Sequence, residues 1–249
     1  MTAATRRVQL EPGFLLHHYP WRDSSRILEV LTLSHGRMAL FARAARRSGS
    51  GLPAALQLFA ELLVSWSGRG EAVRMTAAER AATAPSTLAG ARLMSGFYAN
   101  ELVIRLLPRN DPHPELYAAY ATLLAGLADD RVPAARSLRI FEKRLLEALG
   151  YALNLDGEAG SGRPLDASRS YRYRLDAGAE RLDGVAEGSL IFSGASLLAL
   201  AREELDEARS LADARRLLRA ALDQYLDGRE LRTREVLREM RAHAVHDRG

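Results

Sequence analysis

The chain has 249 residues, 47% hydrophobic and 27% charged, a composition typical of a soluble globular protein with one large or two small domains. It has no cysteine, which excludes disulfide bonds, a thiolate nucleophile and a cysteine-ligated zinc site. The net charge of +4 is uneven, because residues 1–80 hold 11 arginines against 6 acidic residues. This basic segment indicates a polyanionic partner, with nucleic acid and an anionic membrane as the usual candidates.

Short apolar segments separated by turn-rich sequence follow one another between residues 13 and 76. The segment 56–66 fits a helix by periodicity, but Val64, Trp66 and the Ser-Gly turn after them favour a strand. Short antiparallel strands with one longer connection suit a small barrel such as an OB-fold better than a sandwich. We therefore expect a five-stranded barrel, with strands in residues 13–19, 26–33, 36–43, 56–66 and 71–76.

After Pro85 the apolar period changes from two residues to 3.6, which is typical of helices. A stretch at 154–193 interrupts this pattern with glycine-rich sequence and two short strand-like segments, 170–175 and 188–192. The fold class we expect is α+β, with an OB-fold DNA-binding domain at 1–80 and a helical bundle domain at 81–249. Helices are expected within 86–108, 113–129, 132–151, 194–205, 211–226 and 231–245.

Sequence motifs for catalysis are absent: there is no phosphate-binding loop, dinucleotide fingerprint, zinc-protease motif or nucleophile elbow. No carboxylate cluster suited to a metal-dependent nuclease is visible either. We therefore expect a protein that is not an enzyme and has no cofactor and no metal site. No apolar run approaches the ~18 residues of a spanning helix, so we expect a cytoplasmic protein with no membrane partner.

The stretch "FARAARRSGSG", residues 41–51, is basic and holds no acidic residue. In the preceding strand, alternation places Arg37, Phe41 and Arg43 on one face, and Arg46 and Arg47 follow in the loop. Proteins that bind single strands combine cationic tracks with aromatic rings on which bases stack, so these five residues are candidate DNA contacts. The alternative is that Phe41 closes the barrel core and the arginines are merely solvated.

The order of these features resembles the RecO family of bacterial recombination mediators. Similarity to that family spans about 220 residues and is carried by the order and spacing of several segments, none of them diagnostic alone. The segments are "FLLHHYPWRDSSRILEVLTLSHGRMALFARAARR", "LQLF", "SGFYANELVIRLLPRNDPHPELYAAY", "LRIFEKRLLEALGYALNLD", "YRYR" and "YLDGRELRTREVL".

The resemblance implies a non-enzymatic activity: binding of single- and double-stranded DNA, annealing of complementary strands and, with the partner RecR, assistance to RecA in displacing single-strand binding protein. Such a protein would work on the bacterial nucleoid. The family's basic loop falls on Arg43, Arg46 and Arg47. The arginine matching the family's contact for the acidic tail of single-strand binding protein is Arg139, whose alternative role is an ordinary ion pair on the bundle surface.

One departure from the family concerns the four-cysteine zinc site that many members carry after the "LGY" segment. Residues 154–193 contain no cysteine here, so we expect this insertion to fold without metal. Its "YRYR" segment places Arg172 and Arg174 on one strand face and Tyr171 and Tyr173 on the other.

Two further alternatives stay open at the level of sequence. The protein could be an interaction scaffold that binds the tail of single-strand binding protein, with only incidental DNA contact. The arginine-rich helix at 231–245 could carry a second DNA site, although its glutamates at i+3 and i+4 spacing favour a salt-bridged exposed face.

Overall fold

The computed structural model describes residues 6–21, 25–43, 56–68, 72–82, 88–183, 188, 190–226, 228 and 230–246. The chain forms two compact units, one from Met1–Asp129 with Leu231–Gly249 and the other from Asp130–Glu230. Within the described ranges, no helix is both long enough and apolar enough to cross a membrane.

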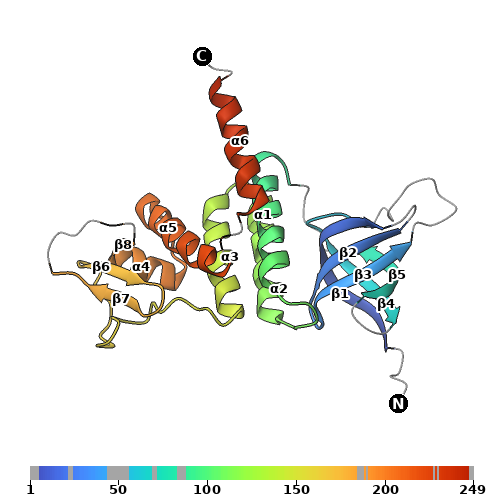
Figure 1. The fold of residues 1–249 in the computed structure, drawn as a ribbon, viewed down its shortest axis with the longest axis horizontal. Coiled ribbons are helices and arrows are strands. Elements are labelled where there is room, and N and C mark those ends of the chain that lie inside the picture. Colours follow the sequence, from blue (N-terminus) through green and yellow to red (C-terminus); the bar gives the residue numbers. More distant parts are fainter. Residues whose placement is uncertain are drawn as a thin grey trace. The chain divides into compact units, whose positions relative to one another are not determined.

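The first unit contains a closed five-stranded barrel with strand order β1-β2-β3-β5-β4, in which β4 pairs back onto β1 (Figure 1). All neighbours are antiparallel except β3 and β5, which are parallel. This confirms the expected N-terminal OB-type barrel. The strands are β1 (Arg6–Trp21), β2 (Ser25–Thr32), β3 (Gly36–Arg43), β4 (Glu61–Gly68) and β5 (Ala72–Arg80).

Strand β1 is longer than the sequence pattern predicts, because it begins at Arg6 and not at Gly13. Its first half pairs with β4 and its second half with β2, so one strand serves two neighbours. Pro12 and Gly13, which resemble a turn, lie inside it and pair with Leu63 and Leu62. Packing explains why a glycine stands at position 13, since an added Cβ would lie 2.9 Å from Val30 Cγ1.

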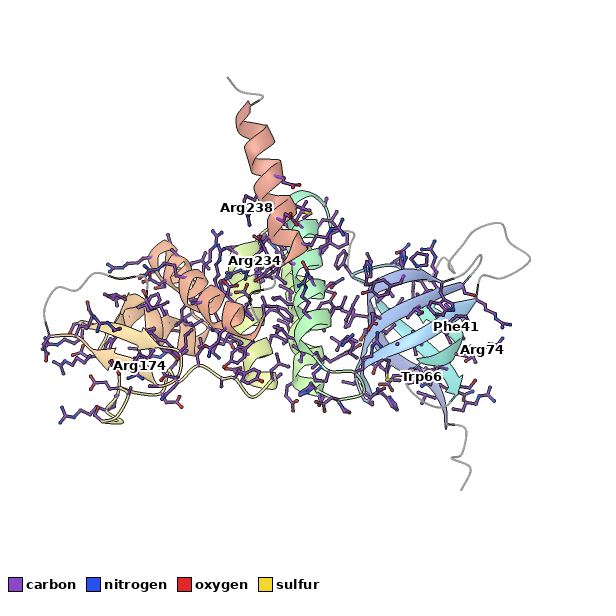
Figure 2. The ribbon with its side chains drawn as sticks, viewed as in Figure 1. Phe41, Trp66, Arg74, Arg174, Arg234 and Arg238 are labelled. Carbon is purple, nitrogen blue, oxygen red and sulfur yellow. The ribbon has the colours of Figure 1, made fainter. Side chains whose placement is uncertain are left out.

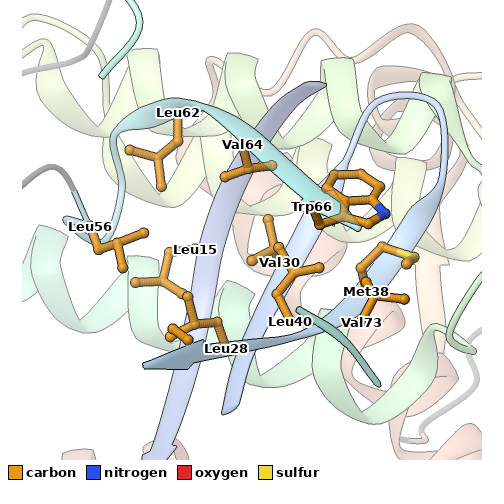
Figure 3. Close-up of a cluster of buried hydrophobic side chains, with 11 residues drawn as sticks. Leu15, Leu28, Val30, Met38, Leu40, Leu56, Leu62, Val64, Trp66 and Val73 are labelled. Atoms are coloured by element: carbon orange, nitrogen blue, oxygen red, sulfur yellow. The ribbon is translucent and has the colours of Figure 1, made fainter. Parts of the chain in front are cut away.

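The barrel interior is filled by side chains from all five strands together with Leu56 (Figure 3). Trp66, labelled in the barrel in Figure 2, is 1% exposed and is the largest of them. Because the inward residues of β3 alternate with its outward ones, the predicted assignment of faces on this strand is confirmed. The cluster comprises Leu15, Leu28, Val30, Met38, Leu40, Ala42, Leu56, Leu62, Val64, Trp66 and Val73.

Three helices complete the first unit, and α1 contacts strand β1 of the barrel. The Asn100 side chain on α1 donates a hydrogen bond to Leu16 O at 2.8 Å and accepts one from the Tyr120 hydroxyl. The ring of Phe14 on β1 packs against that of Tyr117, with the two centroids 5.0 Å apart. The helices are α1 (Gly90–Leu106), α2 (Pro114–Ala128) and α6 (Arg232–His246).

Helix α6 is attached to α1 through its first turn. The Glu101 carboxylate accepts hydrogen bonds from the backbone N–H groups of Arg232 and Thr233, both at 2.9 Å. Burial raises the pKa of Glu101, but the hydrogen bonds from Thr233 and Arg232 and the charge of Arg105 outweigh it and lower the pKa overall. A carboxylate at a helix N-terminus is also favoured by the helix dipole.

The second unit combines three helices with a small antiparallel sheet in the order β7-β6-β8. On β6, Tyr171 and Tyr173 are buried while Arg172 and Arg174 are exposed, which confirms the predicted alternation. The strand β7 was not predicted. The elements are α3 (Ala134–Ala148), β6 (Ser170–Arg174), β7 (Gly178–Arg181), β8 (Ile191–Ser193), α4 (Gly194–Arg202) and α5 (Ala208–Tyr225).

The insertion is held together by tyrosine hydroxyls and backbone bonds. The Tyr171 hydroxyl accepts a hydrogen bond from Asp166 N at 2.9 Å and donates one to Glu158 Oε1 at 3.2 Å. The Tyr173 hydroxyl donates to Asn154 O at 3.3 Å. In the described part of the chain no group of three or more potential ligands could hold a metal ion.

The compact units divide the chain at a different place from the expected boundary at residue 80. The barrel ends there, but α1 and α2 belong to the same unit as the barrel, and α6 returns to that unit at the end of the chain. Helices expected to form one bundle are therefore shared between the two units. Sequence periodicity identifies helices but not the surfaces on which they pack.

Candidate nucleic-acid interface

The outer face of β3 ends in an open, basic region. Phe41 is half-buried and Arg43 is exposed, and both lie on the face opposite Leu40 and the barrel core. Among the described residues, the Arg43 side chain has no ion pair or hydrogen bond. Arg46 and Arg47 lie outside the described residues.

Arg37 lies on the same face of β3 but is engaged within the protein. Its Nη1 donates to Glu29 Oε2 at 2.7 Å and its Nε to Leu107 O at 2.9 Å. Arg109 also donates to Glu29, whose side chain is 1% exposed. Because Nε and Nη1 of Arg37 are both bonded within the protein, we do not use Arg37 in the proposed DNA surface, and its expected DNA contact stays a prediction.

The Arg37 end of this face is also covered by backbone. Asn110 N donates to Arg37 O at 3.0 Å, which brings the segment after α1 against the β2–β3 turn. Gly36 in that turn has φ +68°, and an added Cβ would lie 2.0 Å from Asp111 O. Only glycine fits both the backbone conformation and the close approach.

A third basic side chain near Phe41 comes from strand β5. Arg74 pairs in register with Phe41 across the parallel β3–β5 ladder, and it is exposed (Figure 2). Its side chain has no ion pair or hydrogen bond within the part of the chain that the structure describes. Sequence patterns did not identify this arginine, because only the strand order of the barrel brings β5 beside β3.

Two exposed aromatic residues at the end of β1, Tyr19 and Trp21, were also missed. They share the outer face, since Tyr19 pairs with Ile27 and Ile27 pairs with Phe41. The alternation in "HHYPW" is the signal that could have placed both rings on one face.

On the opposite face of β1 and β2, the side chains of His18 and Arg26 contact each other. Arg26 Nη1 lies 2.9 Å from His18 Nδ1, to which it donates a hydrogen bond. Burial lowers the pKa of His18, as do the charges of Arg26 and His17. His18 therefore stays neutral at neutral pH and adds no positive charge to the interface.

Arg139 belongs to the second unit, where it lies on α3. Its Nη2 is 2.8 Å from Glu142 Oε1, and the two side chains are 10% and 1% exposed. Arg139 Nε is buried without a hydrogen-bond partner among the described residues. The ion pair that was the alternative for this residue is thus present, and it is buried rather than on the surface.

The architecture is that of an OB-barrel protein whose barrel is joined to helices. The family model "Recombination protein O N terminal" matches residues 8–83, and "Recombination protein O C terminal" matches residues 88–235. The chain belongs to the RecO family, as the resemblance indicated.

Similar proteins cover nearly the whole chain. "DNA repair protein RecO" of Alkalilimnicola ehrlichii is 46% identical over 94% of this chain and 92% of its own length. The protein of the same name from Aromatoleum aromaticum is 42% identical, covering 94% of this chain and 97% of its own. That of Coxiella burnetii is 41% identical over 94% of this chain and 99% of its own.

Proposed function

We propose that this protein is a DNA-binding recombination mediator in DNA repair, and not an enzyme. In this proposal it binds single- and double-stranded DNA, anneals complementary strands and, with RecR, helps load RecA onto DNA coated with single-strand binding protein. It would act on nucleoid DNA in the bacterial cytoplasm. Membership of the RecO family and the names of its relatives support the proposal.

The observation that carries the proposal is the open basic end of the barrel face. Arg43 lies two residues after Phe41 on β3, and Arg74 lies beside Phe41 on β5. Neither arginine has an acidic partner among the described residues. The two carboxylates of the described strands β1 to β3 are occupied elsewhere: Glu29 by Arg37 and Arg109, and Glu11 by Ser34 N and His35. Unpaired arginines near an aromatic ring suit a sugar-phosphate backbone with accessible bases.

Salt dependence tests this surface. Replacing Arg43, Arg46 and Arg47 with Ala is expected to weaken single-strand binding and to reduce the slope of log K against log salt by about 0.7 for each phosphate contact, or about 2 in all. The matched control replaces Arg169, Arg172 and Arg174 with Ala, which removes the same charge from exposed positions of the second unit. Equal slopes for the two triple variants would exclude the barrel surface as the DNA site.

Annealing is tested separately from binding. We expect the protein to accelerate pairing of complementary oligonucleotides, both bare and coated with single-strand binding protein, because a surface that neutralises phosphates reduces the repulsion between two strands. A fluorescence-quenching assay with both kinds of substrate measures the rates. Binding without any acceleration would restrict the protein to a scaffold role.

The proposed site for the tail of single-strand binding protein is Arg139, because a guanidinium can hold both oxygens of a terminal carboxylate. Its pairing with Glu142 means that the tail would compete with this carboxylate. A labelled tail peptide should bind wild type more tightly than Arg139→Ala, with Arg139→Lys intermediate because it keeps charge but not the fork. Equal affinities would remove Arg139 from the site.

A further inference from the structure

The last residues of strand β1 expose two large aromatic side chains. Tyr19 is 42% exposed and Trp21 is 46% exposed, whereas Trp66 in the same barrel is 1% exposed. Single exposed apolar side chains are common, but rings at alternate positions of one strand form a continuous patch.

The register of the sheet joins these rings to Phe41. Tyr19 pairs with Ile27, which pairs with Phe41, and residues paired across strands point to the same face. Trp21 pairs with Ser25, which lies opposite Arg43. Tyr19 and Phe41 are thus two strand spacings apart, about 10 Å, so each ring can meet a different base.

The patch is built on paired strands, which keeps the rings in place. The His17 ring meets Tyr19 edge to face, with centroids 4.5 Å apart and an interplanar angle of 70°. Ile27 lies between Tyr19 and Phe41 and is half-buried. A rigid surface of this kind loses little conformational entropy when it binds a ligand.

The surrounding charge indicates which ligand the patch receives. Arg43 lies in the same row as Trp21, and Arg74 lies in the same row as Tyr19 and Phe41. A protein partner would need carboxylates beside apolar groups, whereas a single strand of DNA supplies a phosphate and an exposed base face at every nucleotide. Three rings bordered by Arg43 and Arg74 offer partners for both of these groups.

We propose that Tyr19, Trp21 and Phe41 form a base-stacking surface that makes the barrel prefer unpaired DNA. This inference rests on the proposed DNA binding and deepens it. Arginines contact the phosphates of single strands and duplexes alike, but bases inside a duplex are already stacked on one another, so only unpaired bases reach the rings. The arginines thus account for general affinity and the rings for the choice of strand state.

Tryptophan fluorescence tests the stacking directly, because the chain has two tryptophans and one of them is buried. The emission of Trp21 is obtained as the difference between wild type and Trp21→Phe, which leaves the core unchanged. Saturating oligothymidylate is expected to quench this difference signal, and a duplex of equal length is not. An unchanged Trp21 signal when anisotropy shows that the oligonucleotide is bound would overturn the proposal.

Affinities provide the second test. Tyr19→Ala and Trp21→Ala are each expected to lose roughly tenfold in affinity for single strands, with duplex affinity within twofold and the salt slope unchanged. Trp21→Phe keeps a ring and should retain most of the affinity. The matched control is Tyr151→Ala, which removes a 45% exposed ring from the second unit and should have no effect.

The outcomes separate this inference from the proposed function. If single-strand and duplex affinities fall equally, or neither falls, while wild type binds DNA with a steep salt dependence, the stacking surface is wrong and DNA binding stands. If wild type binds neither form of DNA at low salt, both are wrong. Selective loss of single-strand binding together with Trp21 quenching supports both.

Discussion

The outer faces of β3 in the barrel and of β6 in the small sheet both carry exposed arginines, but these arginines differ in whether they have acidic partners. On β6, Arg174 lies 2.7 Å from Asp176 and 3.0 Å from Glu180, so its charge is balanced within the protein. On the barrel, Arg43 and Arg74 have no such partners in the described part of the chain. The alternation of residues is similar in the two strands, and the neighbouring acids decide whether an arginine remains available for a ligand.

The barrel face itself contains both situations. Arg37 and Arg43 lie on the same face of one strand, yet Arg37 is bonded to Glu29 and Arg43 is exposed. One end of the face is thus closed by internal ion pairs while the other end is open. Arg37 resembles Arg174 because an acidic residue of the protein binds each of them. The open end, at Arg43, is the part of the face that is suited to binding a ligand.

The largest effect is expected from Glu29→Ala at the closed end. Removing the carboxylate takes the acceptor from Nη1 of the largely buried Arg37, and breaking a buried ion pair costs about 3 kcal/mol or more. Urea unfolding measures the loss in the free energy of unfolding. The double variant Glu29→Leu with Arg37→Met should recover most of it, because apolar side chains of similar size can replace a buried pair. If Glu29→Ala were as stable as wild type, Arg37 would not be a structural arginine.

A smaller effect is expected from Tyr171→Phe on the inner face of β6. The change removes a buried hydroxyl and leaves Asp166 N without its acceptor, which costs about 1 to 2 kcal/mol. Tyr173→Phe is the matched control and should cost less, since its hydroxyl makes one bond of 3.3 Å. Thermal unfolding compares the two variants, and DNA affinity should stay unchanged in both. A loss of DNA binding in Tyr171→Phe would contradict the structural role assigned to this sheet.

Sequence reasoning identified the fold because strand and helix periodicities are local properties. The alternation in "GRMALFAR" correctly separated the core residue Leu40 from the outward residues Phe41 and Arg43. It could not show that Arg37 is occupied, because its partner Glu29 lies on a neighbouring strand and Arg109 follows 80 residues after that glutamate. Long-range pairing of this kind depends on strand order and register.

The other residues of the candidate site were missed for the same reason, because their positions depend on strand order and register. Arg74 lies beside Phe41 only because β5 runs parallel to β3, a pairing that no local pattern predicts. Tyr19 and Trp21 could be placed on one face from alternation, but their position in the same rows as Phe41 and Arg43 required the register of β1 with β2. The start of β1 was missed because Pro12 and Gly13 resemble a turn and are tolerated here in a strand.

The smallest effect is expected when the small sheet is made to resemble the barrel face. Asp176→Asn combined with Glu180→Gln removes the acids that hold Arg174 and keeps the side-chain shapes. If available arginines are what distinguish the two faces, the freed Arg174 should raise single-strand affinity at low salt by less than about threefold and steepen the salt slope by up to about 0.7. The same double change combined with Arg174→Ala should cancel the increase in slope, which separates a direct contact from the general effect of net charge. A gain in affinity that persists without Arg174 would mean that overall charge, and not a local unpaired arginine, governs binding on both faces.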